Sequence, residues 1–84
     1  MKAETVFVKH PMSGEILELP FPSVAIFGSE ENCVIMLLTN RDPAKCGIFR
    51  GNLNNEPELR EELFNSKRKL IHWDEDNNKP QVIN

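Results

Sequence analysis

The sequence predicts an α+β fold, in which one amphipathic helix near the C-terminus docks on a small antiparallel sheet of about five strands. Two observations predict this class. Two apolar runs, residues 24–27 and 33–38, are separated by a short polar segment, which is typical of a buried hairpin. Residues 55–65 carry the end signals and the leucine spacing of a helix. Because 84 residues have room for one hydrophobic core, we expect residues 1–84 to form a single domain.

The N-terminal part of the chain predicts another hairpin. Residues 4–9 are rich in β-branched and aromatic side chains, and residues 15–19 return with imperfect alternation. A turn containing Pro and Gly separates them, and we expect His10 at the surface of this turn. Two prolines in the segment 20–22 then stop the return strand, because proline fixes the backbone and withholds an amide donor. This segment is therefore expected to form a corner between two hairpins.

The second apolar run admits two secondary structures. Unbroken apolar character over residues 33–38 predicts a strand that is covered on both faces. A helix competes, because Ser29 is a suitable N-cap and Glu30 and Glu31 would lie at the positive end of the helix dipole. We favour the strand, since the run is short and follows another apolar run of similar character.

The C-terminal half predicts a short strand, a helix and a further strand. Glycines limit the strand to residues 48–50. In the helix over 55–65, Asn55 is the expected cap and Pro57 lies in the first turn. The docking stripe consists of Leu59, Leu63 and Phe64. After a strand over 70–73, an acidic polar turn spans 74–80, and the tail 81–84 either adds a strand or frays.

Charge is unevenly distributed along the chain. Residues 1–42 carry three positive and six negative side chains, whereas residues 43–84 are balanced, and the net charge is −3. An acidic domain disfavours phosphate backbones as partners and suits a basic protein surface. We therefore expect a protein-interaction module, such as an inhibitor, adaptor or assembly subunit, of the kind that mobile elements often encode, with no catalysis, cofactor or metal. A homodimer or other homo-oligomer would compensate for the small core.

The expected partner-binding residues are Glu58, Glu61, Glu62 and Trp73. The three glutamates lie on the predicted helix, and an exposed aromatic side chain is a frequent interface anchor. Phe21 and Phe49 would act in the same way if they were exposed. Edge strands at residues 5–8 or 70–73 could also accept a strand from a partner or from a second copy.

Two other classes of function compete with protein binding. An enzyme would use Cys46, whose thiolate is favoured by nearby cations, with His72 or His10 as its base. A nucleic-acid binder would use Lys67, Arg68 and Lys69 with Trp73, although the acidic pI near 5.3 disfavours it.

Metal sites would have to be assembled by the fold. Zinc could draw on His10, Cys33, Cys46 and His72, none of which are paired at short spacing. Asp74, Asp76 and Asn78 have the spacing of the first three ligands of a calcium loop. The Gly that a calcium loop needs for its sharp turn and the later bidentate Glu ligand are both missing.

A cytoplasmic location is expected for three reasons. The first residues lack the apolar region of a signal peptide. No apolar run approaches the roughly 18 residues that span a bilayer, so we expect no membrane contact. Without a secretory signal, Cys33 and Cys46 are expected to remain reduced thiols.

Overall fold

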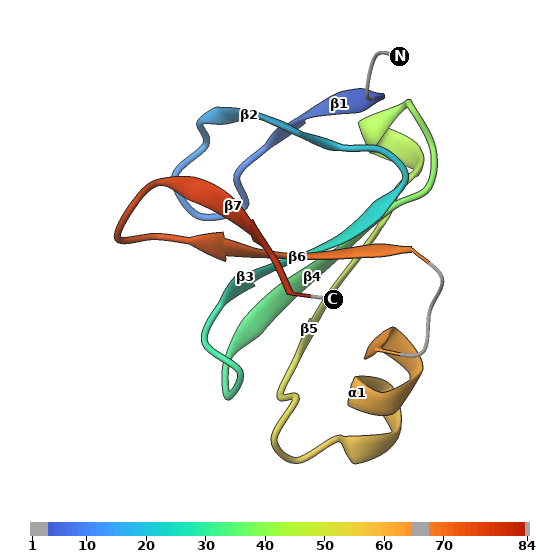
Figure 1. Cartoon of the computed structure of the whole chain (residues 1–84), viewed down its shortest axis with the longest axis vertical. Coiled ribbons are helices and arrows are strands. Elements are labelled where there is room, and N and C mark those ends of the chain that lie inside the picture. The colour runs from blue at the N-terminus through green and yellow to red at the C-terminus, as the bar shows by residue number, and fades with distance from the viewer. Residues whose placement is uncertain (1–3, 65–67, 84) are drawn as a thin grey trace.

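The chain forms two β-sheets and a short helix (Figure 1). The structure, a computed structural model, describes residues 4–64 and 68–83. These residues contain seven strands, one α-helix and one 3-10 turn. The strands form a two-stranded sheet and a five-stranded sheet of order β5-β4-β3-β6-β7. The α+β class fits broadly, but the expected single sheet of about five strands is wrong. The helix is also followed by two more strands and does not close the chain.

The first two strands form the predicted N-terminal hairpin. Strand β1 (Thr5–Lys9) pairs antiparallel with β2 (Ile16–Pro20), and Val6 lies opposite Leu19. Alternate side chains of both strands are buried, which is typical of a sheet with one solvated face. The corner after β2 contains a cis peptide bond between Phe21 and Pro22.

The two central apolar runs form a hairpin of two strands. The predicted strand over residues 33–38 is therefore confirmed, and the competing helix is not formed. Strand β3 (Ser23–Gly28) pairs antiparallel with β4 (Cys33–Leu38) along its full length. Both strands are buried on both faces, because the β1–β2 hairpin covers one face of the sheet and the helix packs on the other. Gly28 leaves β3 with a φ of 96°, a conformation that L side chains rarely adopt.

The remaining strands complete a mixed sheet, so the expectation of a wholly antiparallel sheet is wrong. The 3-10 turn (Pro43–Lys45) precedes β5 (Gly47–Gly51), which pairs with β4 at one edge. Strand β6 (Lys69–Asp74) runs parallel to β3, and β7 (Lys79–Val82) pairs antiparallel with β6 at the other edge. The prediction of an edge strand at 70–73 is therefore wrong, since β6 lies inside the sheet. The tail adds a strand, but β7 begins at Lys79, so the polar turn expected over 74–80 is shorter than predicted.

Helix α1 (Pro57–Phe64) is shorter than predicted. It begins after Glu56, whose carbonyl accepts the Arg60 N–H at 3.0 Å, so the cap is Glu56 and not Asn55. The Glu56 carboxylate also accepts the Asn52 N–H at 3.1 Å, which ties the preceding loop to the helix. Leu63 is buried and Leu59 partly buried against the sheet. The end of the predicted helix and the Phe64 side chain lie outside what the structure describes.

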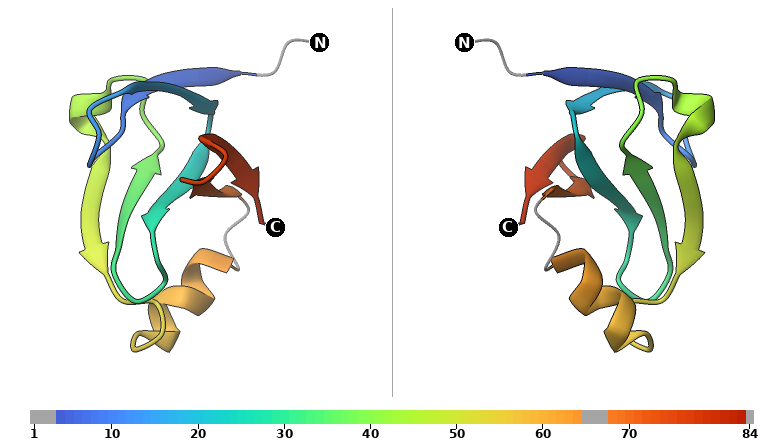
Figure 2. Two further views of the ribbon diagram at one scale, coloured as in Figure 1. Left: turned by 90° about the vertical axis from the view of Figure 1, so that its left-hand side faces the viewer. Right: turned by 90° about the vertical axis from the view of Figure 1, so that its right-hand side faces the viewer.

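Two hydrophobic clusters lie on opposite faces of the five-stranded sheet. Alternate residues of β3 and β4 point to each of them, since successive side chains of a strand face opposite ways. The cluster beneath the first hairpin contains Val6, Val8, Leu17, Leu19, Ala25, Phe27, Val34, Met36, Leu38, Cys46 and Trp73. The cluster beneath the helix contains Val24, Ile26, Cys33, Ile35, Leu53, Leu63 and Leu70. Figure 2 shows the hairpin and α1 at opposite ends of the molecule.

Candidate functional site

The outer surface of α1 carries the three glutamates that the sequence singled out. Glu58, Glu61 and Glu62 are all exposed. They are spaced i, i+3 and i+4, which places them on one stripe of the helix. Within the part of the chain that the structure describes, no cation forms an ion pair with any of them, whereas Arg60 pairs with Glu30 at 3.2 Å. We call Glu58, Glu61 and Glu62 the acidic helix surface.

This charge arrangement is not explained by helix stability. Glu58 lies in the first turn, where the helix dipole favours an anion. Glu62 lies in the last turn, where the dipole favours a cation, and that turn contains no basic residue. Like charges at i, i+4 cost an isolated helix roughly 0.2–0.5 kcal/mol per pair. Glu62 is therefore unfavourable for the helix, and among the described residues no ion pair offsets its charge.

Trp73, the fourth expected partner-binding residue, lies in the core. Its side chain is 5% exposed, and its ring centroid is 6.4 Å from that of Phe27 and 6.1 Å from that of His10. Its indole N–H is buried without a hydrogen-bond acceptor among the described residues. The Trp73 ring thus presents no face to a partner in this structure. Phe21 and Phe49 are half-buried.

His10 is buried, so the expectation of a surface position is wrong. Its side chain is 3% exposed. Its Nδ1 accepts the backbone N–H groups of Met12 and Ser13 at 3.1 and 3.2 Å, which leaves Nε2 to carry the proton. Nε2 then donates to the Glu75 carboxylate at 2.9 Å. Every polar atom of the ring is engaged in structure, and none is left to act as a base.

The two cysteines lie on opposite faces of the sheet. Cys33 donates its thiol to the Gly51 carbonyl at 3.3 Å, and burial raises the pKa of this thiol. Cys46 donates to the Asn40 carbonyl at 3.2 Å. His72 lies on the face opposite Cys46, because it alternates with Trp73 along β6. Among the described residues, neither histidine hydrogen-bonds to Cys46.

No zinc or calcium site is assembled by the residues described. They include no group of three or more His, Cys, Asp or Glu side chains that could hold a metal ion. Asp74 instead accepts the Asn77 side-chain amide at 2.7 Å and the Asp76 and Asn77 backbone N–H groups. These hydrogen bonds, that of the Asn77 side chain foremost, lower the pKa of Asp74. The residues that have only the first spacing of a calcium loop thus form the ordinary polar turn expected between β6 and β7.

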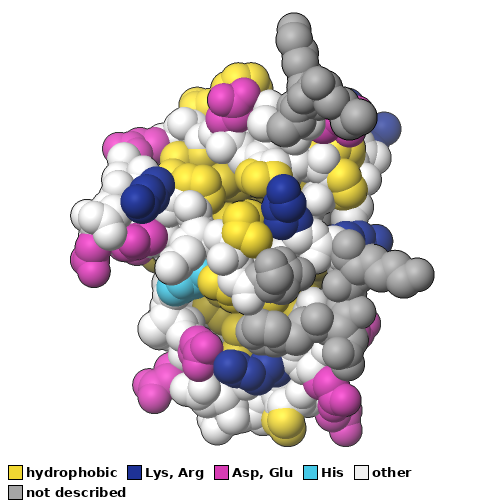
Figure 3. All heavy atoms as spheres, viewed as in Figure 1, with side chains coloured by type: hydrophobic (Ala, Val, Ile, Leu, Met, Phe, Trp, Pro, Cys, Tyr) yellow, Lys and Arg dark blue, Asp and Glu magenta, His cyan; other side chains and the backbone are white. Residues whose placement is uncertain are grey.

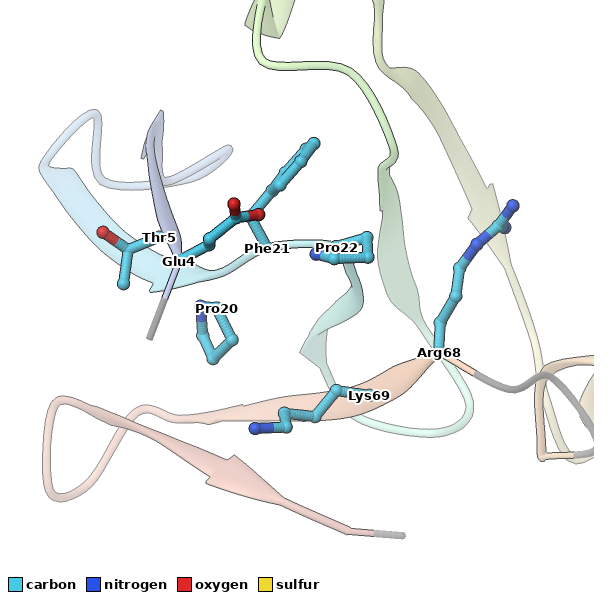
Figure 4. A pocket seen from close by; sticks show the side chains of 7 residues that line it. All are labelled: Glu4, Thr5, Pro20, Phe21, Pro22, Arg68 and Lys69. Carbon is cyan, nitrogen blue, oxygen red and sulfur yellow. The ribbon is translucent and has the colours of Figure 1, made fainter. Parts of the chain in front are cut away.

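The basic segment proposed for nucleic-acid binding, residues 67–69, is only partly described, because Lys67 lies outside the described residues. Arg68 and Lys69 are exposed and line a cavity of about 470 Å³ at the corner between β2 and β3 (Figure 4). The two side chains point away from each other, so they do not form one concentrated positive surface. The other lining residues are Glu4, Thr5, Pro20, Phe21 and Pro22. Glu4 pairs with Arg41 at 3.3 Å, and the Arg41 guanidinium lies 4.8 Å from the Phe21 ring centroid.

A second, smaller cavity was not foreseen from the sequence. It has a volume of about 250 Å³ and lies on the helix side of the sheet. Its lining residues are Ile26, Glu30, Leu53, His72 and Ile83. They come from five separate segments of the chain, so no local pattern in the sequence could have grouped them.

Comparison of the chain with protein-family models, curated proteins and solved structures finds no match. Among the described residues, no helix is long and apolar enough to cross a membrane.

Proposed function

We propose that this domain is an acidic protein-interaction module, acting as an inhibitor, adaptor or assembly subunit and binding its partner through the acidic helix surface. The observation that supports it is the exposed stripe formed by Glu58, Glu61 and Glu62, with which no cation of the described residues forms an ion pair. An exposed acidic stripe that includes Glu62 at the negative end of the helix dipole is better explained by recognition than by folding. Stability is commonly lower where a surface is shaped for function.

The partner is expected to present a basic surface. The whole chain has a net charge of −3, so its long-range field adds to the local attraction of the helix. Complementary charge mainly raises the association rate and the specificity of a complex, and salt weakens both effects. The free thiols of Cys33 and Cys46 support a reducing compartment, and we place the module in the cytoplasm.

Charge reversal on the helix tests this proposal. The triple variant E58K/E61K/E62K should lose a partner that the wild-type domain captures from its native cytosol at low salt. A matched control, E15K/E31K/D76K, changes the net charge equally at three exposed positions away from α1. If the partner is lost from the helix variant alone, the acidic helix surface is the site. Equal retention by both variants would contradict the proposal.

Equal loss from both variants would mean that net charge, and not this surface, governs association. Circular dichroism of each variant establishes that the fold is kept. Capture repeated at high salt should release the partner, because the screening length falls from about 8 Å at physiological ionic strength to about 3 Å at 1 M salt.

A further inference from the structure

The small cavity on the helix side of the sheet is built by neighbouring strands in register. Ile26 of β3 lies beside His72 of β6 in the parallel pair. The Ile83 N–H donates to the Leu70 carbonyl at 3.0 Å, which extends the β6–β7 pairing by one residue. Because Leu70 and His72 share a face of β6, Ile83 lies on the same side of the sheet as His72. Three strands therefore supply the floor and one wall.

Loops supply the opposite wall. Leu53 follows β5 and is buried, and its N–H donates to the Glu30 carbonyl at 2.7 Å. This hydrogen bond holds the turn after β3 against the loop before α1. Figure 3 shows an apolar hollow on this face of the molecule, with a histidine at its edge. An engineered protein cavity of about 150 Å³ binds benzene, so a volume of about 250 Å³ accepts a ring with a short substituent.

The polar groups of the cavity are both acceptors. His72 Nε2 lies 2.8 Å from the Gly28 carbonyl, which can only accept, so Nε2 carries the proton. In the neutral ring Nδ1 is then a lone-pair acceptor, and among the described residues no hydrogen bond engages it. The Glu30 carboxylate uses its Oε2 atom for Arg60 at 3.2 Å, and a carboxylate has about four acceptor positions.

We propose that this cavity is a binding site for a primary amine carried on a short apolar body. The apolar body would pack on Ile26, Leu53 and Ile83, and the ammonium group would donate to the Glu30 carboxylate and to His72 Nδ1. A hydrogen bond to an ionised acceptor is stronger than a neutral one, so charge selects the amine over an alcohol of the same shape. The site is separate from the acidic helix surface and does not depend on the proposed function.

Three ligands of matched shape test the site. Benzylamine, benzyl alcohol and benzoate are titrated into the whole domain at neutral pH and constant ionic strength, and backbone and methyl NMR signals are followed. Benzylamine should shift the signals of Ile26, Leu53 and Ile83 saturably. Benzyl alcohol should bind roughly tenfold more weakly, and benzoate should bind most weakly of the three, because it has no hydrogen to donate to either acceptor. Nα-acetyl-lysine amide, as a further arm, tests whether a protein lysine can supply the amine.

Variants identify the charged acceptor. E30Q should weaken benzylamine binding roughly tenfold, whereas E31Q, in the same exposed turn but outside the cavity, should leave it unchanged. I83K places an ammonium group at the cavity rim near the chain end, so it should also weaken binding without unfolding the domain. The proposal is overturned if benzyl alcohol binds as tightly as benzylamine, if E30Q and I83K both leave benzylamine affinity unchanged, or if neither amine shifts these signals.

Discussion

The Nε2 atom of His10 lies 2.9 Å from a carboxylate oxygen of Glu75, which is 65 residues further along the chain. This hydrogen bond joins the turn of the first hairpin to the turn between β6 and β7. His10 also packs edge-on against Phe27 and Trp73, with ring centroids 4.9 and 6.1 Å away. One buried imidazole therefore links the two sheets through both a hydrogen bond and ring packing.

Removing this ring should destabilise the domain. H10A leaves the Met12 and Ser13 N–H groups without their acceptor and opens a cavity beside Phe27, so we expect a loss of about 2–4 kcal/mol in the free energy of unfolding. Urea denaturation measures it. E75Q, at a half-exposed carboxylate, should cost only about 0.5–1.5 kcal/mol. A control, M12A, removes an exposed side chain from the same turn. A cost of H10A no larger than that of M12A would contradict the role assigned to the ring.

Two glycines with positive φ should respond differently to alanine. At Gly28, with φ 96°, an added Cβ would lie 2.6 Å from the Asn32 carbonyl oxygen, so G28A combines backbone strain with a backbone clash. At Gly14, with φ 79°, the Cβ would meet nothing within 4 Å. We expect G14A to cost about 1 kcal/mol and G28A about 2–3 kcal/mol or more, measured by thermal or urea unfolding. Equal costs would show that the β3–β4 turn adjusts to the extra atom.

Reversing single charges on α1 should separate stability from recognition. E62K puts a cation at the negative end of the helix dipole, four residues after Glu58, and should raise the free energy of unfolding by about 0.3–1 kcal/mol. E58K should lower it by a similar amount, because it places a cation at the positive end. Both substitutions should weaken binding of the proposed partner. If the E62K variant were more stable than the wild type and still bound the partner with unchanged affinity, Glu62 would not belong to the interaction surface.

The Cys33 thiol should make stability fall at high pH. Burial raises its pKa in the folded state, so as pH rises above about 8.5 the unfolded chain loses this proton first. The unfolded state then binds fewer protons than the folded state, and the free energy of unfolding decreases with pH until the folded thiol also ionises. C33A should flatten this dependence relative to the wild type in urea titrations between pH 7 and 10. If the free energy of unfolding fell with pH as steeply in C33A as in the wild type, groups other than Cys33 would cause the loss of stability at high pH.

Cys46 should react slowly with thiol reagents. Its side chain is 9% exposed and donates to the Asn40 carbonyl, so we expect labelling near neutral pH to be limited by local opening of the fold. C33A leaves Cys46 as the single thiol for this measurement. Labelling faster than that of the unfolded chain in urea would favour the enzyme hypothesis, in which Cys46 is an activated nucleophile.

Much of the local structure could be predicted from the chain alone. Turn residues and apolar runs predicted both N-terminal hairpins, and the choice of strand over helix for residues 33–38 is confirmed by β4. The helix was placed correctly to within a few residues by Pro57 and the leucine spacing. These features depend on neighbours in sequence, because strand alternation, helix periodicity and turn chemistry are all short-range.

Long-range placement was decided by the tertiary structure. Residues 70–73 were predicted at a sheet edge, but the parallel pairing of β3 with β6 places them inside the sheet. The same pairing buries Trp73 beneath the first hairpin. His10 became a core residue because Glu75 and the aromatic rings of the sheet surround it, and none of these contacts is visible in the sequence around residue 10.

The amino-acid sequence by itself thus determined the two N-terminal hairpins, the approximate position of the helix and which surface of α1 is charged. The tertiary structure alone decided which strand edges meet, which aromatic side chains remain exposed and where cavities form. The physical reason is that neither apolar burial nor backbone hydrogen bonding specifies which two distant segments of the chain must meet. Any two apolar strands can pair, and the packing of all of them together selects one arrangement.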